Sequence, residues 1–147
     1  ILVCLVGSEM CIRDRIYLDA QTHTCIEEVG AANFFCVKDG VLYTPELTGT
    51  ILPGITRASI IELARNAGIE VHETKVTAEF AMSADEAFCC GTAAVISPIG
   101  SITHGEVKAS YGDGKPGPMT EQLYNHLVGI QNETEEDIFG WLHEVPL

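Results

Sequence analysis

The stretch CIEEVGAANFFCVKDGVLYTP, residues Cys25 to Pro45, decides the fold because it holds several strand patterns in a row. CIEEV, NFFCVK and VLYTP are short apolar runs, separated by Gly30-Ala31-Ala32 and by Asp39-Gly40. An Asp-Gly pair between two such runs is typical of a two-residue hairpin turn. The stretch therefore predicts consecutive short strands, the last two of which form a hairpin.

Two segments farther along the chain show helical spacing. The first runs from about Ile55 to Ala67, and Gly68 supplies its stop. The second opens at Pro118, a residue that is favoured at the first position of a helix. The apolar residues that share a face are Ile60, Leu63, Ala64 and Ala67 in the first segment, and Leu123, Leu127 and Ile130 in the second.

The remaining segments add strands and one short helix. IYLDA (16–20) and IEVHETKV (69–76) read as strands, and TAEFAMSAD (77–85) as a short helix. EAFCCGTAAVISPIGSI (86–102) predicts two buried strands joined by a turn, and residues 111–117 form a Gly/Pro-rich loop. This mixture predicts an α+β domain of short strands with a few flanking helices.

The first fifteen residues, ILVCLVGSEMCIRDR, differ from the rest. They have no initiator Met, and their apolar run is too short for a membrane span or a secretory signal. They resemble a translated sequencing-library adapter. We therefore expect residues 1–15 to be a non-native leader, left out of the fold prediction, and residues 16–147 to be a domain whose upstream part is missing.

The composition excludes some partners. The chain has 147 residues, is 46% hydrophobic and carries a net charge of −13, which fits one globular domain. Such an acidic chain is not expected to bind nucleic acid or an anionic membrane surface. The six cysteines form no C-x-x-C pair and no zinc spacing, so we predict no metal site and favour a reduced, cytoplasmic protein.

Two stretches could hold an anion. In LPGIT, Gly54 lets the backbone approach a ligand, and the free N–H groups of Ile55 and Thr56 point along the helix dipole. In CCGTAAV, the Thr92 hydroxyl and the Ala93 N–H could also face an anion. Taken alone, a plain helix start and a plain tight turn explain these two stretches better, because such features greatly outnumber anion sites.

The motifs together carry a more specific signal. YLDA, IEEVGAANFF, TPELTGTILPGITRASIIELAR, DEAFCCGTAAVISPIGSI and the ending FGWLHEVPL resemble the branched-chain amino acid aminotransferases. The resemblance runs in register from about Tyr17 to Leu147. It implies a pyridoxal 5′-phosphate enzyme of fold type IV, a D-amino acid aminotransferase-like fold. The chain would be its large C-terminal domain, with short strands in a barrel-like mixed sheet and flanking helices.

The resemblance also implies roles for single residues. Glu28 would bond the protonated pyridine nitrogen of the cofactor, while Glu27 points the other way. Ile55, Thr56 and Thr92 would hold the phosphate. The Ala93 N–H would face the substrate carboxylate, and Gly30 and Ala31 would line the substrate pocket.

The implied activity is reversible amino transfer between leucine, isoleucine or valine and 2-oxoglutarate, by a homodimer when the protein is full length. The Schiff-base lysine of the family lies upstream of YLDA, and Lys38, Lys75, Lys108 and Lys115 match no catalytic position. This chain is therefore expected to be inactive alone. Alternatives are a D-amino acid aminotransferase or aminodeoxychorismate lyase of the same fold, or a non-catalytic anion-binding domain.

Overall fold

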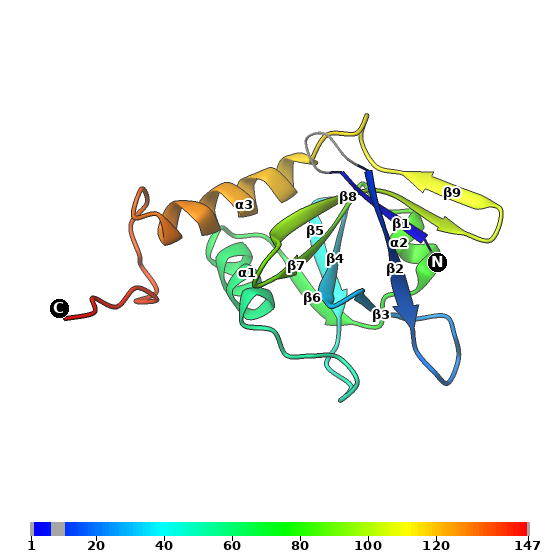
Figure 1. Ribbon diagram of the computed structural model, residues 1–147, viewed down its shortest axis with the longest axis horizontal. Helices are drawn as coiled ribbons and strands as arrows, with labels where there is room; N and C mark the ends of the chain where they lie inside the picture. Colours follow the sequence, from blue (N-terminus) through cyan, green and yellow to red (C-terminus); the bar gives the residue numbers. More distant parts are fainter. Residues whose placement is uncertain (1, 7–10, 147) are drawn as a thin grey trace.

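The structure is a computed structural model that describes residues 2–6 and 11–146, with side chains from Arg15 onward. In this part of the chain the strands are β1 (Leu2–Val6), β2 (Cys11–Leu18), β3 (Ile26–Val29), β4 (Ala32–Lys38), β5 (Val41–Pro45), β6 (Val71–Thr74), β7 (Glu86–Gly91), β8 (Val95–His104) and β9 (Val107–Ser110). The helices are α1 (Ile55–Asn66), α2 (Ala78–Met82) and α3 (Pro118–Gln131) (Figure 1).

The strands form one curled sheet in the order β3-β2-β1-β8-β7-β4-β5-β6, and β9 pairs with β8. Strand β3 also pairs with β4, so the sheet closes into a ring of pairings through β2, β1, β8 and β7. All pairs are antiparallel except β5 with β6, which is parallel. The predicted barrel-like mixed sheet with flanking helices is therefore confirmed.

The stretch from Cys25 to Pro45 folds as predicted into β3, β4 and β5. Asp39 and Gly40 both have positive φ, 53° and 77°, as a tight hairpin turn between β4 and β5 requires. Side chains of β4 are buried on both faces: Phe34 belongs to one hydrophobic cluster and Phe35 to the other. Strand β4 is central for this reason, since both of its faces are covered.

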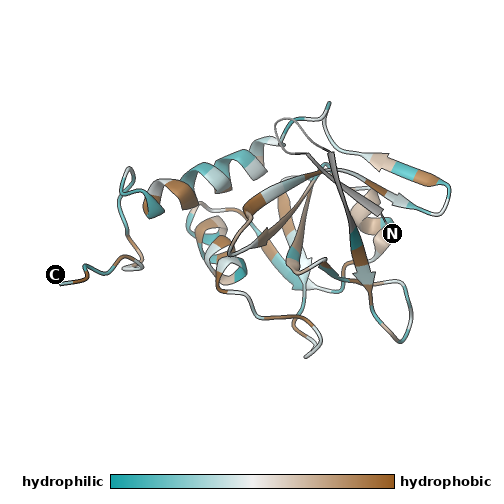
Figure 2. Ribbon diagram, in the orientation of Figure 1, coloured by the Kyte–Doolittle hydropathy of each residue, from teal (hydrophilic) through white to brown (hydrophobic). Residues whose placement is uncertain are grey.

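The two clusters lie on opposite sides of β4. One cluster includes Ile16, Val29, Phe34 and Ile102, and α2 packs beside it. The other includes Phe35, Phe88 and the buried faces of α1 and α3, which pack against each other. Figure 1 shows α1 and α3 together on one side of the sheet, and Figure 2 shows that both helices mix hydrophobic and hydrophilic residues. The predicted apolar faces of these helices are thus confirmed except at Ala67, which is exposed and lies just beyond the last residue of α1.

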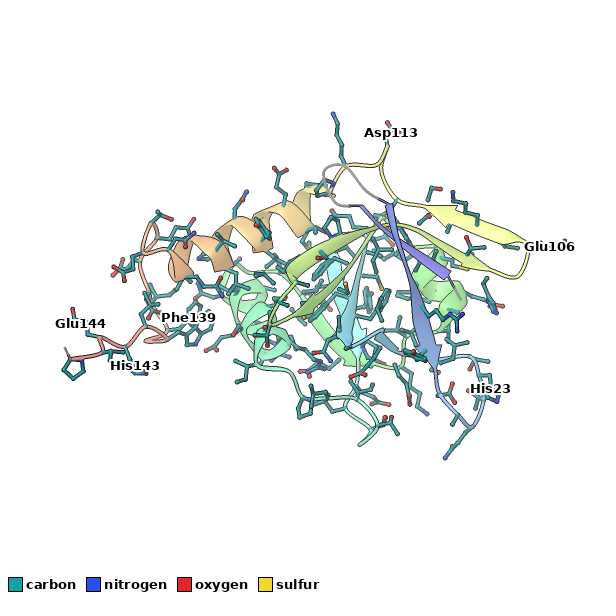
Figure 3. All side chains as sticks on the ribbon, viewed as in Figure 1. His23, Glu106, Asp113, Phe139, His143 and Glu144 are labelled. Atoms are coloured by element: carbon teal, nitrogen blue, oxygen red, sulfur yellow. The ribbon has the colours of Figure 1, made fainter. Side chains whose placement is uncertain are left out.

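The chain ends in an extended segment beyond α3. Phe139 and Trp141 stack on each other and pack against the second cluster, whereas His143 and Glu144 point away from the domain (Figure 3). No helix in residues 2–6 and 11–146 is long and apolar enough to cross a membrane.

The structure adds strands that the sequence analysis does not predict. Residues 1–15 are left out of the fold prediction, yet β1 pairs with β2 and β8, and the first residues of β2 belong to the same sheet. Strand β9 is also unexpected. Its side chains are mostly exposed, so it lacks the alternation that would reveal it. The origin of residues 1–15 stays a prediction.

Candidate functional site

The predicted site residues gather at one edge of the sheet, where strand register brings three segments together. Glu28 on β3 pairs with Asn33 on β4, and Asn33 pairs in turn with Cys90 on β7. The β3–β4 turn carries Gly30 and Ala31 at this edge, and the β7–β8 turn carries Thr92 and Ala93. Residues that are far apart in the sequence therefore meet at the ends of neighbouring strands.

Glu28 is half-buried and faces the loop that leads into α1. Its Oε1 accepts a hydrogen bond from the Leu52 backbone N–H at 2.9 Å. Leu52 lies two residues before Gly54, the residue that caps α1. The carboxylate is thus not directed into bulk solvent but is tied to the segment that begins the helix.

Glu27 bonds the same loop as Glu28, two residues earlier, and lies at an irregularity in the β2–β3 register. Its Oε1 accepts a hydrogen bond from the Thr50 hydroxyl at 2.6 Å, and it lines a cavity of about 390 Å³ together with Asp19, Glu46 and Lys75. Glu28 does not line this cavity. Both carboxylates thus accept from the loop before α1, but only Glu27 also lines the cavity.

The start of α1 presents open backbone donors. Gly54 caps the helix without a side-chain hydrogen bond, and the first turn contains no acidic residue. In the described part of the chain, nothing accepts from the N–H groups of Ile55 and Thr56. The Ile55 side chain is 86% exposed, so this helix end is open to solvent. An anion placed there would meet free N–H groups and the positive end of the helix dipole.

The β7–β8 connection is the predicted tight turn. Thr92, Ala93 and Ala94 form the turn and are exposed, and Val95 follows with a φ of 51°. A left-handed conformation is unusual for a β-branched residue. At its base, a Cβ added to Gly91 would lie 4.0 Å from the Ala32 Cβ, which places this turn beside the start of β4.

Arg57 was not expected to be a buried residue. From the sequence, the spacing of eight residues between Arg57 and Arg65 predicts that they share a helix face, and solvation at the surface would explain both. They do share a face, since both bond Glu73, but Arg57 is only 4% exposed. Its Nη2 donates to the Pro45 carbonyl and to Glu73, each at 2.9 Å. The prediction failed because the covering partners come from β5 and β6, whose approach a helical pattern does not reveal.

Three cysteines lie in the core, whereas Cys25 is only half-buried. Cys36, Cys89 and Cys90 are buried free thiols. Burial raises the pKa of Cys36 and that of Cys90 to about 12, so both thiols stay protonated at neutral pH. Among the residues whose side chains are described, no group of three His, Cys, Asp or Glu side chains is arranged to hold a metal ion.

Comparison with known proteins defines the class of the protein. The family model described as amino-transferase class IV matches residues 9–102, so the chain belongs to this family. A relative, branched-chain-amino-acid aminotransferase 5, chloroplastic, from Arabidopsis thaliana, is 49% identical over 128 residues. The match covers 87% of this chain and 31% of that protein. The chain thus spans about a third of the length of this relative.

Solved structures agree with this assignment. The branched-chain amino acid aminotransferase of Escherichia coli superimposes with a TM-score of 0.80 at 41% identity, over 89% of this chain and 41% of that one. The enzyme of Thermobaculum terrenum in its PLP form gives a TM-score of 0.79 at 35% identity, over 88% and 41%. The predicted fold, that of the branched-chain aminotransferases, is confirmed, and so is the predicted resemblance.

Proposed function

We propose that this chain is the C-terminal, cofactor-binding part of a branched-chain amino acid aminotransferase. The intact enzyme would transfer an amino group reversibly between leucine, isoleucine or valine and 2-oxoglutarate. Family membership and the names of the relatives support this proposal. The observation that carries it is the connection of Glu28, through Leu52, to the open N-terminus of α1.

The residues at this edge fit pyridoxal 5′-phosphate by the chemistry of their donors and acceptors. The cofactor has a phosphate at one end and a pyridine nitrogen at the other. Ile55 and Thr56 supply free N–H groups for the phosphate, and the exposed Thr92 hydroxyl adds a donor. Glu28 supplies a carboxylate for the protonated ring nitrogen. A chain with a net charge of −13 needs such local donors to hold an anion.

The cofactor supplies an electron-accepting ring, and the residues of this chain tune and orient it. A carboxylate beside the ring nitrogen stabilises the protonated, cationic form. The Leu52 N–H keeps Glu28 in place for this task. At the same edge of the sheet, the Ala93 N–H would orient the substrate carboxylate, while Gly30 and Ala31 leave room for the substrate beside β4. These residue roles are part of the proposal.

The proposal places the Schiff-base lysine upstream of Tyr17. The four lysines of the chain support this placement, because none belongs to the site edge. Lys38 bonds the Ser83 hydroxyl, Lys75 lines the separate cavity beside Glu27, Lys108 lies on β9 and Lys115 lies in the loop before α3. A chain without that lysine would bind the cofactor reversibly and would not catalyse transfer.

Borohydride reduction tests this assignment directly. The chain is incubated with pyridoxal 5′-phosphate, reduced, and analysed by mass spectrometry. We expect no adduct on Lys38, Lys75, Lys108 or Lys115. The same chain extended upstream along its reading frame should carry one adduct, on a lysine before Tyr17, and should transfer amino groups from branched-chain amino acids. A stoichiometric adduct on one of the four lysines would contradict the proposal.

The proposal also includes an assembly and a location. We expect the full-length protein to be a homodimer, which light scattering of that protein would check. We expect a cytoplasmic location, which the buried reduced thiols Cys36, Cys89 and Cys90 support. Cell fractionation would check the location, and recovery in an organelle would contradict it.

A further inference from the structure

Asn33 is a buried polar residue to which neither the sequence analysis nor the proposed function gives a role. It is the second residue of β4, is 6% exposed, and lies in register between Glu28 and Cys90. Buried side-chain amides cost free energy unless they are hydrogen-bonded. The partner of Asn33 therefore indicates its role.

That partner is the backbone of the loop before α1. The Asn33 Nδ2 donates to the Leu52 carbonyl oxygen at 2.9 Å. The same carbonyl accepts the Gly54 N–H at 2.8 Å, which closes a tight turn around Pro53. The Leu52 N–H, on the other side, is held by Glu28 at 2.9 Å. Two side chains from adjacent strands thus fix Leu52 at both its N–H and its carbonyl.

The fit between Asn33 and the helix cap is close. A Cβ at Gly54 would overlap the Asn33 Oδ1, so only glycine allows the cap to lie against this amide. The backbone of Gly54 is extended, with φ −63° and ψ 139°, a conformation open to any residue. The glycine is therefore required for space and not for its conformational freedom. Asn33 thus lies directly against the residue that caps α1.

We propose that Asn33 is a positioning residue that sets the separation between Glu28 and the N-terminus of α1. The inference rests on the proposed function, in which Glu28 meets the pyridine nitrogen and α1 meets the phosphate. A ligand that carries both groups gains affinity over its separate parts only when the two contact points are correctly spaced. Loss of Asn33 would free the Leu52 turn and reduce this gain.

The test compares three probes on the 147-residue chain: pyridoxamine 5′-phosphate, pyridoxamine, and inorganic phosphate. The variant is Asn33→Ala, and Asn125→Ala, an exposed site on α3, is the matched control. We expect Asn33→Ala to weaken binding of pyridoxamine 5′-phosphate about tenfold, measured by calorimetry, because one lost positioning contact of this kind is worth about that factor. Binding of the two smaller probes, followed by NMR, should change little.

The outcomes separate the inference from the proposed function. If wild type binds pyridoxamine 5′-phosphate no better than its two parts, the proposed cofactor site fails and the inference fails with it. If wild type binds pyridoxamine 5′-phosphate more tightly than its two parts and Asn33→Ala keeps this added affinity, only the inference about Asn33 is overturned. Equal weakening of all three probes would also overturn it, since that indicates a purely structural role. Should Asn33→Ala not fold, Asn33→Ser keeps a polar group too short to reach Leu52, and the same loss is expected.

Discussion

The helices α1 and α3 begin with nearly the same local sequence but meet different partners. Pro53-Gly54 precedes α1 and Pro116-Gly117 precedes α3, and in both cases glycine is the cap and contributes no side-chain hydrogen bond. At α3, the buried carboxylate of Glu86 accepts from the N–H groups of Met119 and Thr120 at 3.1 and 2.9 Å. At α1, among the residues that the structure describes, no side chain takes this place.

The difference shows how a fold separates a structural helix end from a binding one. Both ends offer free N–H groups and a positive dipole. At α3 the free N–H groups find an acceptor within the molecule, because β7 carries Glu86 to the helix start. The Glu86 carboxylate is only 7% exposed. At α1 no carboxylate of the described residues accepts from the first N–H groups, and Glu28 instead bonds Leu52, two residues before the cap. The strand that approaches each helix start, β7 at α3 and β3 at α1, therefore decides whether the N–H groups are capped within the molecule or left open.

The largest loss of stability is expected from removing the Glu86 carboxylate at the start of α3. Glu86→Ala would leave the Met119 and Thr120 N–H groups without an acceptor. It would also remove the acceptor of the Thr120 hydroxyl, which donates to Glu86 at 2.7 Å. We expect a loss of about 3 kcal/mol in the free energy of unfolding, because hydrogen bonds to a charged group are among the strongest. Urea denaturation measures the loss. Glu121→Ala, an exposed site in the first turn of α3, is the control, and an equal effect at both sites would contradict this account.

The second effect tests the close fit at the α1 cap. Gly54→Ala introduces a Cβ that collides with Asn33, and we expect a loss of about 2 kcal/mol in unfolding free energy, typical of overpacking. In an Asn33→Ala background the space is free, so the same substitution should cost close to nothing. Urea denaturation of the four proteins in this double-mutant cycle gives the coupling. A cost that is equal in both backgrounds would show that Asn33 is not the obstacle.

A smaller effect is expected from making the α1 end resemble the α3 end. Ile55→Asp places a carboxylate in the first turn of α1 without loss of packing, since Ile55 is 86% exposed. The free energy of unfolding should rise by about 0.5 kcal/mol through the helix dipole. Binding of pyridoxamine 5′-phosphate should weaken about tenfold, because the new charge repels the phosphate. Calorimetry checks the affinity, and Ile138→Asp, at a 54% exposed site beyond α3, should leave it unchanged.

Unchanged affinity in Ile55→Asp would place the phosphate elsewhere. The turn at Thr92 would then be the first alternative, because it is exposed at the same edge of the sheet. The opposite signs expected for stability and affinity distinguish this result from general damage to the fold.

The sequence predicts features that depend on neighbouring residues, and it does not predict features that depend on contacts between distant segments. Strands β4 and β5 and helices α1 and α3 were predictable, because periodicity and the Asp39-Gly40 turn are local. The pairing of β1 with β8 was not, because it joins two segments that lie far apart in the sequence. The bond from Asn33 to Leu52 was not predictable either, since it depends on how a loop returns to the sheet.

The candidate site shows the same division. The open N–H groups of Ile55 and Thr56 could be predicted, because a Pro-Gly step before a helical pattern exposes them. The same reasoning applied to Pro116-Gly117 would predict a second anion site, and there the structure places Glu86 instead. Only family resemblance distinguished the two starts at the level of sequence. Burial of Arg57 had no local signal at all, since Glu73 reaches it from β6.

The smallest effect on stability is expected at Asp19, a surface carboxylate that accepts hydrogen bonds from several backbone N–H groups. Asp19 accepts from the N–H groups of Cys25, Thr22 and Thr24 in the turn whose tip carries His23 (Figure 3). The hydrogen bond from the Cys25 N–H, with smaller ones from Thr22 and Thr24, holds the pKa of Asp19 far below its ordinary value. A depressed pKa means that the charged form binds these donors in the folded state. Its stabilisation is therefore complete above the unfolded pKa and is lost as the pH falls toward the folded one.

Asp19→Asn should lower the free energy of unfolding at neutral pH by less than Glu86→Ala does, because water competes for the exposed donors around Asp19. The difference between wild type and Asp19→Asn should shrink as the pH falls through the acidic range, and urea denaturation at several pH values measures it. Asp113→Asn, an exposed loop site, should match wild type throughout. A difference that stays constant with pH would mean that the side-chain shape of Asp19, and not its charge, holds the turn together.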